Sequence, residues 1–228
     1  MPFNLPRITK ALLIANVVVF ALQWMLGEGN TRVFELWPLS DGFHDPSGSV
    51  PQFMPWQLVT AGFMHADFWH LFFNMIALVM FGAPLEYVWG ERRFATFYFT
   101  CLVGAGLCHL VYATWALQTQ STLISAVGAS GAVYGLVLAY GMLFPTRRMV
   151  IFPIPISMTA RTFAILYGAL AVFYGVTGSQ AGVGHVAHLG GMLFGWLLIR
   201  YWRGQPPFGG SKPSKPSKPS RPPLRIVK

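Results

Sequence analysis

Six apolar segments, each near the length that crosses a membrane, most constrain what this chain can fold into. A helix needs about 20 apolar residues to cross about 30 Å of hydrocarbon, and a chain in lipid must satisfy its own backbone hydrogen bonds. Only 10% of the 228 residues are charged, against about 25% in soluble domains. We therefore expect an all-α membrane protein, a bundle of six transmembrane helices. The segments cover residues 11–26, 68–88, 94–117, 123–144, 163–176 and 183–202.

The basic residues predict how these helices are oriented. The formal net charge is +9, but Lys and Arg occur in short clusters between apolar segments, which is typical of membrane topology and not of nucleic-acid binding. All 16 Lys and Arg residues except Arg32 fall on one side. The positive-inside rule then places both termini in the cytoplasm, as an even number of spans requires. We expect a multi-pass protein of a prokaryotic inner (plasma) membrane, with the lipid bilayer and no nucleic acid as partners.

Composition divides the chain into a body and a tail. Residues 1–204 hold the apolar segments and are expected to form one six-span domain. Residues 205–228 are rich in Ser, Lys and Pro and are expected to form a disordered, basic cytoplasmic tail near anionic lipid. Cys101 and Cys108 lie in one apolar segment and are interpreted as buried thiols without a redox or metal role.

A serine and a histidine inside apolar segments are the first candidate functional residues, because polar groups in a membrane are costly. Ser130 lies in the turn Gly128-Ala129-Ser130-Gly131, near the start of the fourth segment. His188 lies in the sixth. A histidine in a Gly-rich helix is by itself more often structural. The pairing of the two motifs instead indicates nucleophilic catalysis by a hydroxyl bonded to an imidazole.

Small residues at four-residue spacing supply a way to bring the two segments together. Such a pattern lets two transmembrane helices approach closely, and it would place Ser130 within about 2.6–3.2 Å of His188. The small residues are Gly131 and Gly135 in the fourth segment, and Ala187, Gly191 and Gly195 in the sixth.

Further polar residues complete the candidate site. His70 and Asn74 share a helix face, either as hydrogen-bonding residues between helices or as part of the site. Tyr134, one turn after Ser130, is expected to pack against the imidazole of His188. No Asp or Glu lies in the last three apolar segments, so a Ser-His dyad is expected, with Asp67 left open as a third member.

Three histidines have no assigned role. A metal pair of His185 with His188 is conceivable, but no third ligand is placed nearby, and we expect neither a metal nor a cofactor. His65 is interpreted as an interfacial structural residue, and His109 is unexplained.

Taken together, the motifs resemble the rhomboid family of intramembrane serine proteases, over residues 11–203. Gly128-Ala129-Ser130-Gly131 resembles the nucleophile motif of that family, and His70-x-x-x-Asn74 resembles its second-span motif. The histidine helix is similar over Ala187-His188-x-x-Gly191-x-x-x-Gly195, and residues 86–94 resemble the segment that links the second and third spans. The Trp-Arg pair that many members carry in the first outer loop is not evident.

The resemblance implies a role for each of these residues. Ser130 would be the nucleophile and His188 the general base. The Ser130 N–H and the side chains of His70 and Asn74 would hold the oxyanion. Gly128 would let the chain enter the fourth helix below the membrane surface and expose an N–H. Gly131, Gly191 and Tyr134 would support this geometry.

The same resemblance implies that the substrates are single-pass transmembrane helices, cut near their outer end. Two other functions remain open. A catalytically silent relative would bind transmembrane clients without cutting them. A transporter would normally need intramembrane carboxylates or paired discontinuous helices, and central acids are absent from the segments. The physiological substrate and the oligomeric state are not predicted.

Overall fold

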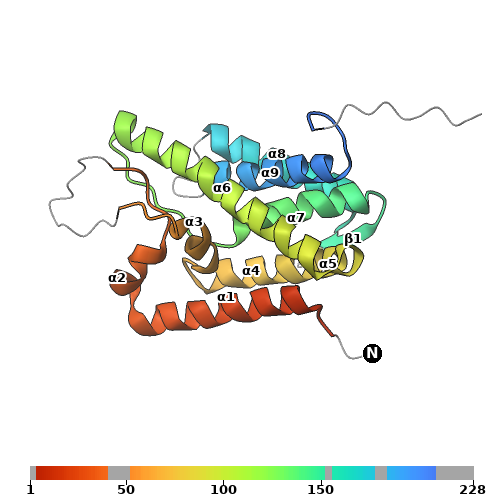
Figure 1. Cartoon of the computed structure of the whole chain (residues 1–228), viewed down its shortest axis with the longest axis horizontal. Helices are drawn as coiled ribbons and strands as arrows, with labels where there is room; N and C mark the ends of the chain where they lie inside the picture. The colour runs from red at the N-terminus through yellow and green to blue at the C-terminus, as the bar shows by residue number, and fades with distance from the viewer. Residues whose placement is uncertain (1–3, 41–51, 152–155, 178–183, 209–228) are drawn as a thin grey trace, which may run out of the picture.

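The computed structural model describes residues 4–40, 52–151, 156–177 and 184–208, which fold into a bundle of helices running along a common direction (Figure 1). Residues 209–228, most of the predicted tail, lie outside the described residues, so the division at residue 204 stays a prediction. The long helices are α1 (Arg7–Leu26), a continuous helix of α4 (Phe68–Ala77), the π-helical η3 (Leu78–Gly82) and α5 (Ala83–Trp89), then α6 (Glu91–Gln120), α7 (Ser130–Leu143), α8 (Ala160–Thr177) and α9 (His185–Trp202).

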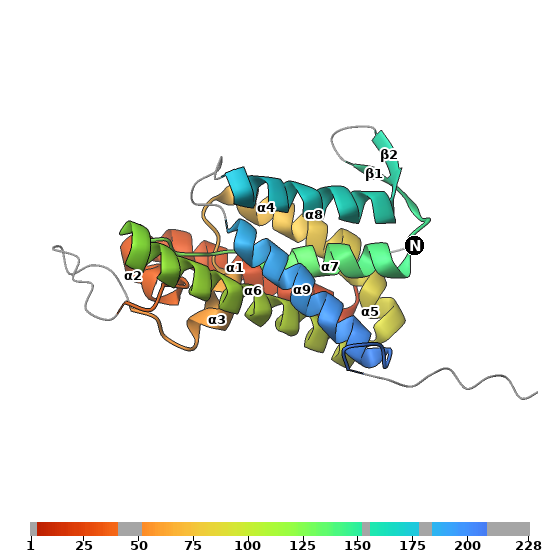
Figure 2. The same ribbon diagram turned by 90° about the horizontal axis from the view of Figure 1, so that it is seen from above.

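Short elements lie at the two ends of the bundle (Figure 2). One end carries α2 (Glu28–Thr31), the 3₁₀ turn η1 (Arg32–Phe34), α3 (Gln57–Thr60) and the 3₁₀ turn η2 (Ala61–Phe63). The other carries an antiparallel hairpin of β1 (Arg148–Ile151) and β2 (Ile156–Thr159), in which Arg148 pairs with Thr159. The sequence analysis did not predict this hairpin.

Within the described residues, four helices are long and apolar enough to cross a membrane. They are α1, the continuous helix Phe68–Trp89, α6 and α8. α7 is apolar but has only 14 residues, and α9 carries two histidines, three glycines and an arginine, which lower its hydropathy. The chain is therefore a mostly helical, multi-pass membrane protein.

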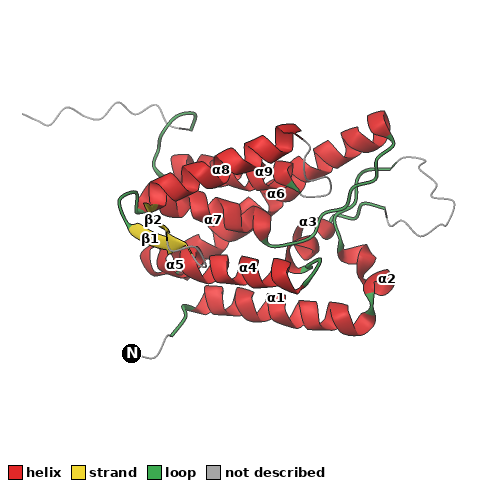
Figure 3. Cartoon of the chain, turned by 180° about the vertical axis from the view of Figure 1, so that it is seen from behind, coloured by secondary structure: helices red, strands yellow, loops and turns green. Residues whose placement is uncertain are grey.

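The described basic residues gather at one end of the bundle. Arg7 opens α1, Arg92 lies near the start of α6, Arg148 begins β1 and Arg203 follows α9. Figure 3 shows the first described residues and the hairpin at this end, and α2 and α3 at the other. Arg32, in η1, lies at the other end. The one-sided distribution predicted from the loops is thus present in the fold.

The fourth apolar segment is helical only from Ser130, so the prediction of a helix from residue 123 is wrong at its start. The backbones of Ala126 and Leu36 exchange two hydrogen bonds of 3.0 Å, and the Gly128 N–H donates to the Ala61 carbonyl at 2.8 Å. Gly128 has φ +114°, a conformation that residues with a Cβ rarely adopt. Neighbouring segments satisfy this backbone, so no helix is needed there.

α7 lies in the centre of the bundle, where small residues allow its neighbours to approach. It packs against α6, α8 and α9, and ten of its 14 residues are buried. A Cβ on Gly131 would collide with the Cβ of Ala105 on α6, and a Cβ on Gly191 of α9 would collide with the Gly131 carbonyl oxygen. The predicted Gly pattern therefore does bring α7 and α9 into backbone contact.

A buried carboxylate fixes the start of α1. Glu86 on α5 is buried, and its oxygens accept the backbone N–H groups of Ile8 and Thr9 and the Thr9 hydroxyl at 2.7–2.8 Å. The first N–H groups of a helix have no acceptor within the helix, and the positive end of its dipole favours an anion. Glu86 thus caps α1 from a distant part of the chain.

We expect Glu86→Ala to lower the free energy of unfolding by about 3 kcal/mol, since it removes the shared acceptor of three donors, two of them buried. Glu91→Ala is the matched control, because the ion pair of Glu91 with Arg7 is long, 3.7 Å, and half or more exposed on both sides. Its loss should change stability by about 0.5 kcal/mol or less. Unfolding of the purified protein in detergent measures both, and equal losses would contradict the capping role.

Candidate active site

Ser130 and His188 are hydrogen-bonded to each other. The Ser130 Oγ lies 2.8 Å from the His188 Nε2, although the residues are 58 positions apart in the sequence. Ser130 is the first residue of α7, and His188 lies in the first turn of α9. The backbone contact between Gly131 and Gly191 brings these two helix starts together. This is the geometry in which an imidazole can take a proton from a hydroxyl.

A stack of aromatic rings holds the imidazole in place. The Tyr134 ring lies parallel to His188, with 4.1 Å between ring centroids and 6° between planes. Tyr167 of α8 stacks on the other side of Tyr134 at 4.3 Å. The spacing from Ser130 predicted the Tyr134 contact. It did not predict Tyr167, because nothing in the sequence indicates which face of α8 meets α7.

His188 Nδ1 has no hydrogen-bond partner among the described residues. Asp67, the acid left open as a third member, instead accepts the His70 backbone N–H at 2.9 Å and caps α4. In a triad an acid on Nδ1 would fix the orientation of the imidazole. Here the stacked tyrosine is the contact that orients the ring, and among the described residues no acid bonds to the Nδ1 of the Ser130–His188 pair, the expected dyad.

The dyad opens into a large cavity of about 1030 Å³. Ser130 and His188 line it together with His70, Asn74 and Gly128, so the structure brings the predicted site residues to one place. The His70 ring lies against Gly128, where a Cβ would be 2.6 Å from its Cε1. Asn74 is buried, and its amide donates to the His70 carbonyl at 3.0 Å.

Of the two backbone N–H groups expected to face this cavity, those of Ser130 and Gly128, one is already hydrogen-bonded. The Gly128 N–H is already used, since it donates to Ala61. The N–H of Ser130 has no acceptor among the described residues, because the first N–H groups of a helix have no partner within the helix. Of these two backbone N–H groups, that of Ser130 is therefore the one left without an acceptor among the described residues. Gly128 matters instead for its positive φ and for the space that it leaves to His70.

His65, His109 and His185 surround the site without joining the dyad. His65 is fully buried, and its ring meets His70 edge-on at 5.1 Å. Burial lowers the pKa of His65 to about 4, so it is neutral at pH 7. His109 is buried beside the cavity, and the His185 ring lies 5.9 Å from His188. Within the described residues, no three His, Cys, Asp or Glu side chains converge as metal ligands would.

Comparison with known proteins shows which family this chain resembles along most of its length. The family model of the rhomboid domain matches residues 52–204. A mitochondrial protein of Saccharomyces cerevisiae, rhomboid protein 1, is 30% identical over 147 residues, covering 63% of this chain and 42% of the relative. The rhomboid protease AarA of Providencia stuartii is 28% identical over 153 residues, covering 63% and 54%. The rhomboid-like protease 3 of Toxoplasma gondii is 26% identical over 192 residues, covering 83% and 66%. The chain thus spans less than two thirds of these relatives.

Proposed function

Because this chain belongs to the rhomboid family, we propose that it is an intramembrane serine endopeptidase that cleaves single-pass transmembrane helices near their outer end. The observation that carries the proposal is the 2.8 Å hydrogen bond between Ser130 and His188 inside the bundle. The relatives named as rhomboid proteases support the same reaction class.

In the proposed reaction, the Ser130 Oγ attacks the carbonyl carbon of a substrate peptide bond. His188 Nε2 takes the hydroxyl proton and then gives it to the leaving amine, which breaks the C–N bond and leaves an acyl-enzyme. Water in the cavity attacks the ester by the reverse sequence, with His188 again as base. No metal or cofactor is needed for these steps.

The negative oxygen of the tetrahedral intermediate needs donors that are already in place. The unpaired N–H of Ser130 is one, and the second amide hydrogen of Asn74 is another. His70 is a third, because its Nδ1 accepts the Ala66 N–H at 3.5 Å. The proton of a neutral His70 ring is then on Nε2, the nitrogen beside Gly128.

The depth of the site supports a cut near the outer end of the substrate. With 14 residues, α7 is about 21 Å long, so a bilayer core of about 30 Å leaves Ser130 about 9 Å below one surface. We propose that the non-helical residues 123–129 complete this span, which makes six spans with both termini on the basic, cytoplasmic side. We further propose residues 1–204 as the catalytic domain and 205–228 as the tail, in a prokaryotic inner membrane.

The function is tested with the purified chain in proteoliposomes and a fluorescent single-span substrate. We expect the wild type to cleave within the outer part of the substrate helix, as located by the masses of the products, and Ser130→Ala to give only background. Equal cleavage by both would identify a contaminating protease. If neither cuts while the folded protein still binds the helix, the client-binding function would replace the proposed one.

We expect Asn74→Ala to lower kcat by about 10²–10³-fold with little change in KM, the effect of removing one oxyanion donor. If Asn74 only links helices, its replacement should instead lower the unfolding temperature and leave kcat nearly unchanged. Measuring kcat, KM and thermal unfolding of the same preparation separates the two. A loss of stability without a loss of kcat would show that Asn74 does not stabilise the oxyanion.

A further inference from the structure

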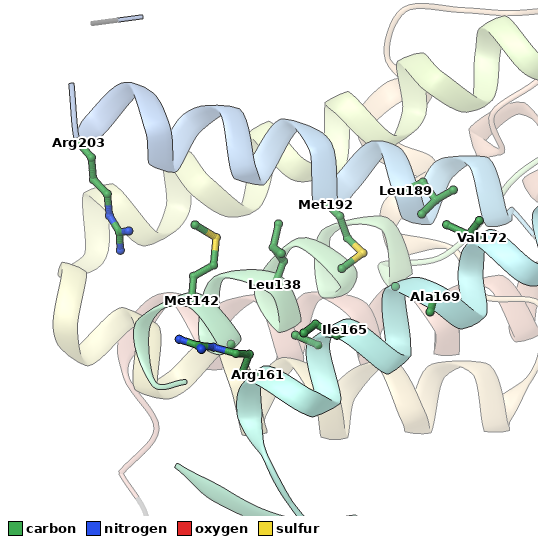
Figure 4. Close-up of a pocket in the computed structure, with 12 residues that line it drawn as sticks. Leu138, Met142, Arg161, Ile165, Ala169, Val172, Leu189, Met192 and Arg203 are labelled. Atoms are coloured by element: carbon green, nitrogen blue, oxygen red, sulfur yellow. The ribbon is translucent and has the colours of Figure 1, made fainter. Parts of the chain in front are cut away.

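We infer that an anionic phospholipid binds in a groove between α7, α8 and α9, on the outside of the bundle. The groove is a second cavity, of about 530 Å³, separate from the one that holds the dyad. Figure 4 shows its arrangement: apolar side chains line its length, and two arginines lie at one end. The inference requires a membrane protein, but it does not depend on proteolytic activity.

The walls of the groove suit an acyl chain. One wall is a face of α8 that includes Ile165, Ala169 and Val172, and the other is formed by Leu189 and Met192 of α9. Ile165 is 63% exposed and Val172 is 47% exposed, so the groove opens outward. Apolar side chains exposed on a transmembrane helix face lipid, and a lipid tail is the apolar molecule available there.

The arginines define the charge of the ligand. Arg161 is the second residue of α8, Arg203 follows α9, and both are exposed at the groove's end. Among the described residues, no carboxylate pairs with either guanidinium. Two unpaired guanidinium groups at the mouth of an apolar groove match a phosphate or another anionic headgroup. The ligand is therefore amphipathic, with an anionic head and an apolar tail.

The length of the groove matches one leaflet. Arg161 and Val172 are 11 residues apart on α8, which is about 16 Å along a helix. Half of a hydrocarbon core of about 30 Å is about 15 Å. The arginines lie at the basic end of the bundle, where a phosphate would sit at the leaflet surface and its acyl chain would extend to Val172. These dimensions identify a phospholipid of that leaflet as the occupant.

The groove also lies beside a helix that packs against the bundle with few of its side chains. Only Ala160, Ala164 and Ala171 of the 18 residues of α8 are buried. α8 nevertheless carries Tyr167, which stacks on Tyr134. A lipid between α8 and α9 would fill the gap beside this helix and hold it against α7.

The test is native mass spectrometry of the full chain in a non-ionic detergent, after removal of copurified lipid. The protein is titrated with phosphatidylglycerol and, separately, with phosphatidylcholine of the same acyl chains. We expect a single phosphatidylglycerol to bind about 30-fold more tightly than phosphatidylcholine, which corresponds to about 2 kcal/mol, from two arginines near an anionic headgroup. Equal affinities for the two lipids would overturn the inference.

Two variant pairs locate the bound lipid. Arg161→Gln/Arg203→Gln should abolish the preference for phosphatidylglycerol. Lys10→Gln/Arg92→Gln removes the same charge from exposed positions elsewhere at this end and should keep the preference.

Ala169→Trp fills the groove and should weaken binding at least 10-fold. Leu166→Trp, on α8 but outside the groove lining, should not. Circular dichroism checks that each variant is folded. If both groove variants bind like their controls, the lipid lies elsewhere and the inference is wrong.

Discussion

We expect His188→Ala to lower kcat by about 10⁶-fold, to the level of Ser130→Ala, and the double variant to be no slower than either. In serine proteases the nucleophile and its base act as a unit, so removing one costs about as much as removing both. The 2.8 Å hydrogen bond to His188 is the only one that the Ser130 hydroxyl makes among the described residues, so no other described group is placed to take its proton. The proteoliposome assay, run to single-turnover sensitivity, measures all three variants.

His185→Ala is the matched control for this prediction. It removes a second buried histidine from the same helix turn, but its ring lies 5.9 Å from that of His188 and is not bonded to Ser130. Its effect on kcat should be smaller by several orders of magnitude. If His188→Ala kept more than about a hundredth of the wild-type rate, or if the double variant were much slower than each single one, the assignment of Ser130 and His188 as a catalytic dyad would be wrong.

The pairing of Ser130 with His188 could be predicted from the sequence because, in a helix, spacing along the chain determines which residues lie on the same face. Small residues repeated every four positions form one helix face, and two such faces can meet only with their backbones close together. The two faces meet at the close backbone contact between Gly131 and Gly191. The position of Tyr134 follows from the same periodicity, since it lies one turn after Ser130. These predictions concern residues within single helices, where the helix repeat fixes relative positions.

Other features depend on contacts between distant segments and were not predictable in this way. Hydropathy cannot distinguish a helix from an extended buried segment, so the pairing of Leu36 with Ala126 and the late start of α7 were missed. Glu86 lies 78 positions from Ile8, and no local pattern connects them. Tyr167 reaches the site only because α8 presents that face to α7.

We expect Gly191→Ala to lower kcat by at least about 10²-fold and to lower the unfolding temperature. A Cβ on Gly191 would collide with the Gly131 carbonyl oxygen and lie 2.7 Å from the carbonyl carbon. Backbone cannot move aside as a flexible side chain can, so α7 and α9 must separate. Alanine is favoured over glycine in a helix by about 1 kcal/mol, but overpacking typically costs about 1–3 kcal/mol. Since Gly131 follows the nucleophile, the separation also lengthens the bond between Ser130 and His188, and a displacement of about 1 Å can lower a rate about 10²-fold.

Two other glycines separate this effect from a general loss of packing. A Cβ on Gly195 of α9 would lie 2.9 Å from Phe97 Cζ and 3.0 Å from Cys101 Sγ, which are side-chain atoms farther from the dyad. Gly195→Ala should therefore lower the unfolding temperature but reduce kcat much less than Gly191→Ala does. A Cβ on Gly175 of α8 would make only an ordinary contact, 3.5 Å from His185 Cβ, so Gly175→Ala should leave kcat unchanged and should not lower the unfolding temperature. If Gly195→Ala reduced kcat as strongly as Gly191→Ala, the close approach of α7 and α9 would serve stability alone and not the alignment of the dyad.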